Sequence, residues 1–220
     1  MVDVTFHSAA LNRDMQYRTI VPVNVAPDQK VPVLYLLHGG GGGFHDWSNY
    51  SDVARYAERG LILVMPEGNS SYYTNSADHP QDRYEDYIVH DLIADVEHRF
   101  PALSGRANRA IAGVSMGGFG AVVLALKHPD LFVFAGGLSS ALDVPSRPFS
   151  IKRVGQWQQH SSIFWIMGKS EPKSQRSICS GRLCRSNTDT VSFSYLWPAG
   201  RPFDGQQKIC RHAAGAPVPI

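Results

Sequence analysis

The chain has 220 residues, of which 43% are hydrophobic and 18% are charged, and its formal net charge is +2. This composition is that of an ordinary globular protein, and the length allows one substantial core. Because the net charge is so small, it gives no reason to expect a nucleic acid or an anionic membrane as a partner.

Short aliphatic blocks alternate with helical patterns along the chain, which predicts a mostly parallel sheet covered by helices. Two antiparallel strands are expected to enter the sheet, at 2–6 and 16–21. Buried strands are then expected at 33–37, 61–65, 109–114 and 132–138. The helices are expected at 50–59, 84–100 and 121–127.

The strand at 33–37 ends in His38 and a run of five glycines, Gly39 to Gly43. Glycines after a strand bring bare backbone N–H groups close to a ligand, and acyl-transfer enzymes need such donors for the oxyanion of the tetrahedral intermediate. A flexible linker is the alternative, but the run follows an aliphatic strand and is followed at once by aromatic residues. No Gly-Lys-Ser/Thr follows the run, so it is not a phosphate-binding loop.

The segment "RAIAGVSMGGFGAVVLALKHP", residues 109–129, places Ser115 between an apolar strand and a helix. Gly113, Ser115 and Gly117 fit the pattern G-x-S-x-G, in which a serine on a sharp strand-to-helix turn exposes its hydroxyl. An ordinary glycine-rich turn is the alternative. The strand before the serine and the helix after it favour the catalytic interpretation, with Met116 as one donor of an oxyanion hole.

Four segments occur in a specific order: "LLHGGGG", "VMPEGNSSYYTN" at 64–75, "YEDYIVHDLIADVEHRFP" at 84–101, and "AGVSMGG". Over roughly residues 5–164 the chain resembles the esterase family of S-formylglutathione hydrolase (esterase D), tributyrin esterase, feruloyl and acetylxylan esterases, and the antigen 85 mycolyltransferases. The resemblance implies an α/β-hydrolase fold, with a mostly parallel central sheet and helices on both faces. It also implies that Ser115 is the catalytic nucleophile and that Gly40 and Met116 form the oxyanion hole.

The implied activity is a serine esterase that hydrolyses short-chain acyl esters or thioesters through an acyl-enzyme on Ser115, with no cofactor and no metal. Two alternatives stay open: an acyltransferase of the antigen 85 type, and a truncated homologue with impaired catalysis. The expected partner is a small-molecule ester or thioester, without nucleic acid or membrane, and a homo-oligomer is an option. The first residues lack the regions of a signal peptide, which makes the cytoplasm the expected location.

The pattern changes at about Trp165. Residues 165–220 show no helical stripe, few aliphatic blocks, and all three cysteines, whose spacing matches neither a zinc site nor a disulfide framework. We interpret 1–220 as a single α/β-hydrolase domain that is family-like over 1–164 and atypical over 165–220, and we hypothesise that this tail is read out of frame. A tail without strands would leave one sheet edge unpaired, which favours self-association.

The family's acid and histidine lie C-terminal to the serine, and this tail leaves both of them unassigned. In the tail or next to it, the acid candidates are Glu171, Asp189 and Asp204, and the histidine candidates are His160 and His212. None of them follows a recognisable strand. His38, His45 and His79 lie on loops near the expected cleft, where structural hydrogen bonds are the better interpretation. Glu67 and residues 69–75 are expected to line the same cleft, and a plain surface loop is the alternative.

Overall fold

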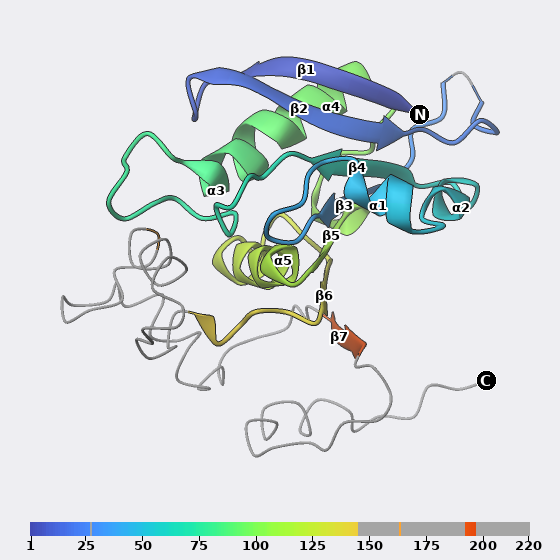
Figure 1. Cartoon of the computed structure of the whole chain (residues 1–220). Coiled ribbons are helices and arrows are strands. Elements are labelled where there is room, and N and C mark those ends of the chain that lie inside the picture. The colour runs from blue at the N-terminus through green and yellow to red at the C-terminus, as the bar shows by residue number, and fades with distance from the viewer. Residues whose placement is uncertain (27, 145–162, 164–191, 197–220) are drawn as a thin grey trace.

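The computed structural model describes residues 1–26, 28–144, 163 and 192–196, the last five as backbone (Figure 1). The strands that it describes form one sheet in the order β1-β2-β4-β3-β5-β6-β7. An antiparallel hairpin opens the sheet, formed by β1 (Val2–Ser8) and β2 (Arg13–Ile20). The antiparallel pair of β2 with β4 (Ile62–Pro66) joins this hairpin to the parallel part of the sheet.

The parallel part contains the strands expected to hold the site. β3 (Val33–Leu37) lies between β4 and β5 (Arg109–Val114), and β6 (Phe134–Leu138) lies beside β5. Because these neighbours are parallel, the segments that follow β3, β4, β5 and β6 all emerge at one edge of the sheet. The predicted sheet and its entering hairpin are confirmed, with shifts of one to three residues at strand ends.

The seventh strand corrects the reading of the tail. β7 (Ser192–Leu196) pairs in parallel with β6, from Phe134 opposite Ser192 to Leu138 opposite Leu196. The prediction that the tail contains no strand is therefore wrong, and β6 is not an unpaired edge. The segment "SFSYL" alternates serine with larger apolar residues, which is the period of a strand. The segment lacks the consecutive aliphatic residues that mark the strands of the parallel part.

The helices differ from the prediction in two places. The expected helix at 50–59 is two short helices, α1 (Asp46–Tyr50) and α2 (Ala54–Ala57), because the backbone is extended at Ser51. The helix after the serine, α5 (Met116–Lys127), begins directly at Met116 rather than at 121. The predicted helix at 84–100 is confirmed as a continuous segment of α3 (Tyr84–Asp86), a π-helical stretch η1 (Tyr87–Leu92) and α4 (Ile93–Arg99). A short 3₁₀ turn η2 (Arg106–Asn108) precedes β5.

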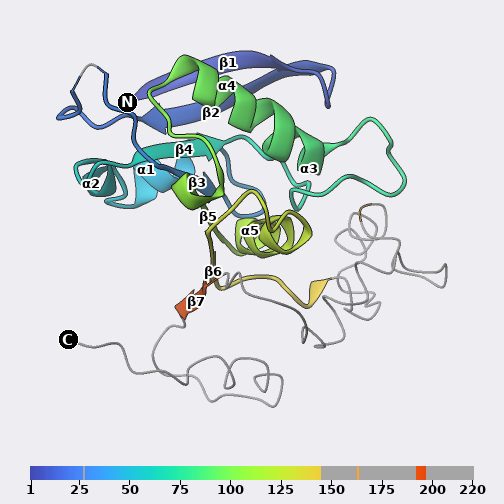
Figure 2. The ribbon, with the colours of Figure 1, turned by 180° about the vertical axis from the view of Figure 1, so that it is seen from behind.

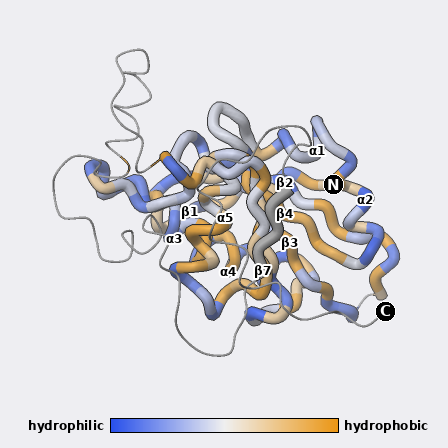
Figure 3. The backbone as a smooth tube through the Cα atoms, turned by 90° about the horizontal axis from the view of Figure 1, so that it is seen from below, coloured by the Kyte–Doolittle hydropathy of each residue, from blue (hydrophilic) through white to orange (hydrophobic). Residues whose placement is uncertain are grey.

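The two faces of the sheet carry separate cores because side chains alternate along each strand. Tyr35 and Leu37 of β3 belong to the larger core, which contains residues of η1, α4 and α5, whereas Leu36 belongs to the smaller core, with residues of α1 and α2. Figure 2 shows α4 and α5 on the same side of the sheet. In Figure 3 the hydrophobic colour is concentrated on β3, β4 and α5. The helices thus fix the sheet from both faces.

Candidate active site

Ser115 joins β5 to α5 at the carboxyl edge of the sheet. Its backbone angles, φ 53° and ψ −112°, are strained for a residue with a side chain. Hydrogen bonds hold this conformation: its N–H donates to the carbonyl of Leu138 over 2.8 Å, and its own carbonyl accepts from Phe119 over 3.0 Å and from Ala141 over 3.1 Å. Ser115 is exposed, whereas Met116 beside it is buried. The turn therefore presents a serine hydroxyl at an accessible point of a rigid frame.

The two glycines of the motif let backbone segments meet. A Cβ atom on Gly113 would lie 2.3 Å from the carbonyl carbon of Gly117, and a Cβ atom on Gly117 would lie 2.2 Å from the carbonyl oxygen of Leu37. Neither contact can be relieved by turning a side chain, since the opposing atoms belong to the backbone. The close approach of strand and helix inferred from G-x-S-x-G is confirmed.

The glycine run lies beside this turn. A Cβ atom built on Gly39 would lie 3.7 Å from the Cβ of Ser115, and one built on Gly40 would lie 3.9 Å from the Cβ of Met116. Met116 is the first residue of α5, where N–H groups have no acceptor within the helix and where the helix dipole favours negative charge. The structure therefore brings together Ser115, Gly40 and Met116 at one edge of the sheet.

His38 connects the glycine run to the loop that follows β4 through hydrogen bonds of its ring. Its buried ring donates from Nδ1 to the carbonyl of Gly39 over 2.8 Å and accepts at Nε2 from the N–H of Gly68 over 2.9 Å. Because a carbonyl oxygen can only accept, the partner of Nδ1 requires a proton on that ring atom. The hydroxyl of Tyr73, which is fully buried, donates to the carbonyl of His38 over 3.2 Å. His38 therefore has a structural role, as inferred from its sequence position.

Glu67 connects the same two loops through its carboxylate. Oε2 accepts from the N–H of Phe44 over 3.3 Å, and Oε1 accepts from the N–H of Asn69 over 2.7 Å. Oε1 also lies 3.3 Å from Nε2 of His38. Burial raises the pKa of this carboxyl, but the neighbouring ring of His38 and the N–H groups of Asn69 and Phe44 lower the pKa more, and the net pKa is below its usual value. The sequence placed Glu67 at the cleft but gave no signal of this bridge.

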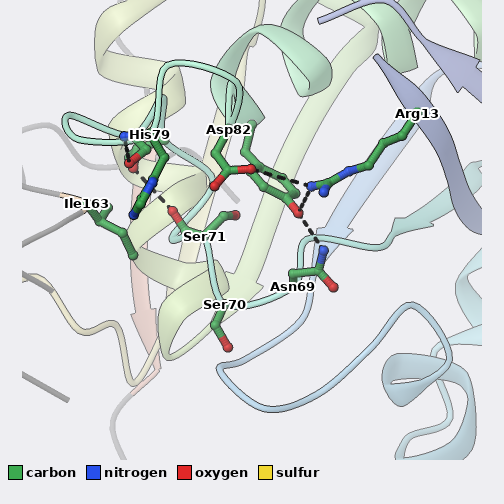
Figure 4. Close-up of a pocket in the computed structure, with 10 residues that line it drawn as sticks. Arg13, Asn69, Ser70, Ser71, His79, Asp82 and Ile163 are labelled. Atoms are coloured by element: carbon green, nitrogen blue, oxygen red, sulfur yellow. Dashed lines mark hydrogen bonds and ion pairs between the residues drawn. The ribbon is translucent and has the colours of Figure 1, made fainter. Parts of the chain in front are cut away.

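A polar cavity of about 310 Å³ opens beside the loop after β4 (Figure 4). Its described lining is Arg13, Asn69, Ser70, Ser71, Thr74, Ser76, His79, Asp82, Tyr84 and Ile163. The guanidinium of Arg13 donates to the hydroxyl of Tyr84 over 2.5 Å and lies 3.8 Å from the carboxylate of Asp82. His79 and Asn69 therefore line this pocket, while Ser115 is not among its described lining residues.

The candidates for the acid and the histidine all lie outside the described residues, and so does most of the segment covered by the reading-frame hypothesis. Glu171, Asp189, Asp204, His160 and His212 therefore remain unplaced, and the hypothesis stays a prediction. Within the part of the chain that the structure describes, no group of three or more metal-binding side chains gathers. No helix in that part has both the length and the apolar character needed to cross a bilayer.

Comparison with known proteins gives consistent results. The family model "Esterase", described as "Putative esterase", matches residues 8–188. An acetyl esterase of Caldicellulosiruptor saccharolyticus is 30% identical over 152 residues, which are 64% of this chain and 56% of that protein. The chain thus spans little more than half the length of this relative.

Solved structures share the fold. FphF, a fluorophosphonate-binding serine hydrolase of Staphylococcus aureus, aligns with a TM-score of 0.66 and 24% identity over 81% of this chain and 71% of that one. S-formylglutathione hydrolase FrmB from the same organism aligns with a TM-score of 0.61 and 24% identity over 73% of this chain and 66% of that one. These similarities, with the sheet order and its covering helices, confirm the predicted α/β-hydrolase fold.

Proposed function

The chain belongs to the esterase family, and on that premise we propose that it is a serine esterase acting on short-chain acyl esters or thioesters through an acyl-enzyme on Ser115. The observation that carries the proposal is the exposed serine on a strained strand-to-helix turn, beside Gly40 and the first N–H of α5. The 30% identity to an acetyl esterase supports an ester substrate with a small acyl group.

In the proposed mechanism, the hydroxyl of Ser115 attacks the carbonyl carbon of the bound ester. The negative charge that develops on the carbonyl oxygen is stabilised by the N–H groups of Gly40 and Met116, which form the oxyanion hole. Collapse of this intermediate releases the alcohol or thiol and leaves the acyl group on the serine. Water then attacks the acyl-enzyme and releases the acid. No cofactor or metal takes part.

A base must take the proton of Ser115 and return it to the leaving group, and in serine esterases a histidine oriented by an acid does this. The candidates for this pair that the sequence offers, Glu171, Asp189 and Asp204 for the acid and His160 and His212 for the histidine, lie outside the described part of the chain. A truncated homologue with impaired catalysis is the alternative, because residues 165–220 depart from the pattern of the family. Its rate would be the small residual rate that binding and the oxyanion hole provide alone.

Product analysis tests hydrolysis against acyl transfer. We expect the protein to convert p-nitrophenyl acetate and p-nitrophenyl butyrate into free acetate and butyrate, even when a primary alcohol is added as an acceptor, because water resolves the proposed acyl-enzyme. Gas chromatography of the acids and esters measures this. Formation of the new ester as the main product would support the antigen 85 type of transfer, and no product above a buffer blank would support the impaired homologue.

The remaining parts of the proposal concern partners and location. We propose a small-molecule ester or thioester as the partner, without nucleic acid or membrane, and the cytoplasm as the location. We also propose self-association. The unpaired edge expected from the sequence is not at β6, because β6 is paired with β7. Among the described strands, β7 is the edge strand at the end of the sheet opposite β1.

A further inference from the structure

The loop that carries Gly40 is held at both of its ends. We call residues 39–44 the oxyanion loop. At its start, the carbonyl of Gly39 accepts from the ring of His38 over 2.8 Å and from the N–H of Gly42 over 3.1 Å. At its end, the N–H of Phe44 donates to the carboxylate of Glu67. Gly40 and Gly41 lie between these two attachments and are exposed.

We propose that Glu67 is a positioning residue that sets the conformation of the oxyanion loop, and thereby the placement of the Gly40 N–H, for the esterase reaction. The inference rests on the proposed function, since it concerns the same site. Glu67 acts through the loop and needs no contact with the substrate. It differs from His38 because it holds the far end of the loop, where the chain leaves the glycine run.

Two features explain why this position carries a carboxylate. First, its two oxygens accept from two loops at once, from Phe44 over 3.3 Å and from Asn69 over 2.7 Å, and a carboxylate accepts at both oxygens whereas an amide accepts at one. Second, the loop approaches it closely, since a Cβ atom on Gly43 would lie 3.2 Å from its Oε2. A larger residue at Gly43 would press against the carboxylate, so glycine permits the bridge.

The environment of Glu67 strengthens the bridge. Its side chain is only 22% exposed, so the two hydrogen bonds are partly shielded from water. Asn69 N–H holds Oε1 in place, and the adjacent Gly68 N–H is held by His38. The carboxylate is therefore held by a contact that does not depend on Phe44. A rigid acceptor of this kind restricts the loop more than a solvated side chain would.

The test compares Glu67→Gln and Glu67→Ala with Glu97→Gln as the matched control. Glu97 is a carboxylate with a similar exposure of 19%, and it pairs with Arg109 at the other end of β5, away from the oxyanion loop. Two quantities are measured in the full chain: kcat and KM toward p-nitrophenyl acetate, and hydrogen–deuterium exchange of peptides that contain residues 39–47.

We expect Glu67→Ala to lower kcat about 10- to 100-fold with little change in KM, because the oxyanion is bound only in the transition state. Glu67→Gln should fall between this variant and the wild type. Exchange in 39–47 should become faster in both variants and stay unchanged in Glu97→Gln, which should also keep the wild-type kcat.

Unchanged exchange in 39–47 would overturn the proposal, and so would faster exchange with an unchanged kcat. A loss of kcat in Glu97→Gln equal to that in Glu67→Ala would also overturn it, because the effect would then be one of general stability. If the wild type shows no activity above Ser115→Ala, the proposed function fails. The exchange measurement still decides in that case whether Glu67 holds the loop.

Discussion

Ser115→Ala is expected to lower kcat/KM toward p-nitrophenyl acetate by about 10⁴- to 10⁶-fold, to the residual rate that an oxyanion hole provides without a nucleophile. The reason is chemical, because alanine has no atom that can form the acyl-enzyme. The fold should be retained, since the bonds that hold this turn come from backbone atoms of residue 115. Initial rates measure kcat/KM, and circular dichroism checks that the fold is retained.

Ser139→Ala is the matched control for this substitution. Ser139 is also exposed, has a positive φ of 46°, and follows the neighbouring strand β6 at the same edge of the sheet. Its removal should change kcat/KM by no more than a few fold, because it is not on the strand-to-helix turn. A Ser115→Ala protein with the wild-type rate, or an equal loss in Ser139→Ala, would contradict the assignment of the nucleophile.

Gly117→Ala is expected to lower the free energy of unfolding by about 3 kcal/mol or more, which is at the severe end for one added methyl group. The new Cβ would lie 2.2 Å from the carbonyl oxygen of Leu37 and 2.5 Å from that of His38. Relief would require α5 to move away from β3, which would separate the serine turn from the oxyanion loop. Denaturation in guanidinium chloride measures the change.

The control is Gly60→Ala, which adds the same methyl group without a clash. Gly60 has a φ of +82°, and its Cβ would meet no atom within 4 Å, so only the cost of the left-handed backbone remains, about 1 kcal/mol. The difference between the two changes in the free energy of unfolding therefore measures the cost of disturbing the close packing of β3 against α5. Equal destabilisation by the two substitutions would mean that the contact between Gly117 and Leu37 does not hold the turn together.

Features encoded locally could be predicted from the sequence. The strands at 33–37 and 109–114 carry continuous aliphatic blocks, and the glycines around Ser115 mark the sharp turn between strand and helix. Because parallel strands end at the same edge, the proximity of Gly40 to Met116 followed from the order of the elements.

Features that depend on distant contacts could not be predicted. The bridge from Glu67 to Phe44 joins residues 23 positions apart through a single backbone N–H, for which no sequence pattern exists. β7 cannot be predicted from aliphatic blocks, because serine alternates with larger apolar residues in it. Of the expected helix at 50–59, only Tyr50, which ends α1, and Ala54–Ala57 are helical, and the backbone is extended at Ser51 between them.

The most direct test of the central claim is intact-mass spectrometry after treatment with a fluorophosphonate, which phosphonylates serines activated for acyl transfer. We expect one adduct on the wild-type chain, located by peptide mapping at Ser115, and no adduct on Ser115→Ala. A folded wild-type chain that forms no adduct, or one that carries its adduct on another residue, would contradict the claim that Ser115 is the nucleophile of a working esterase.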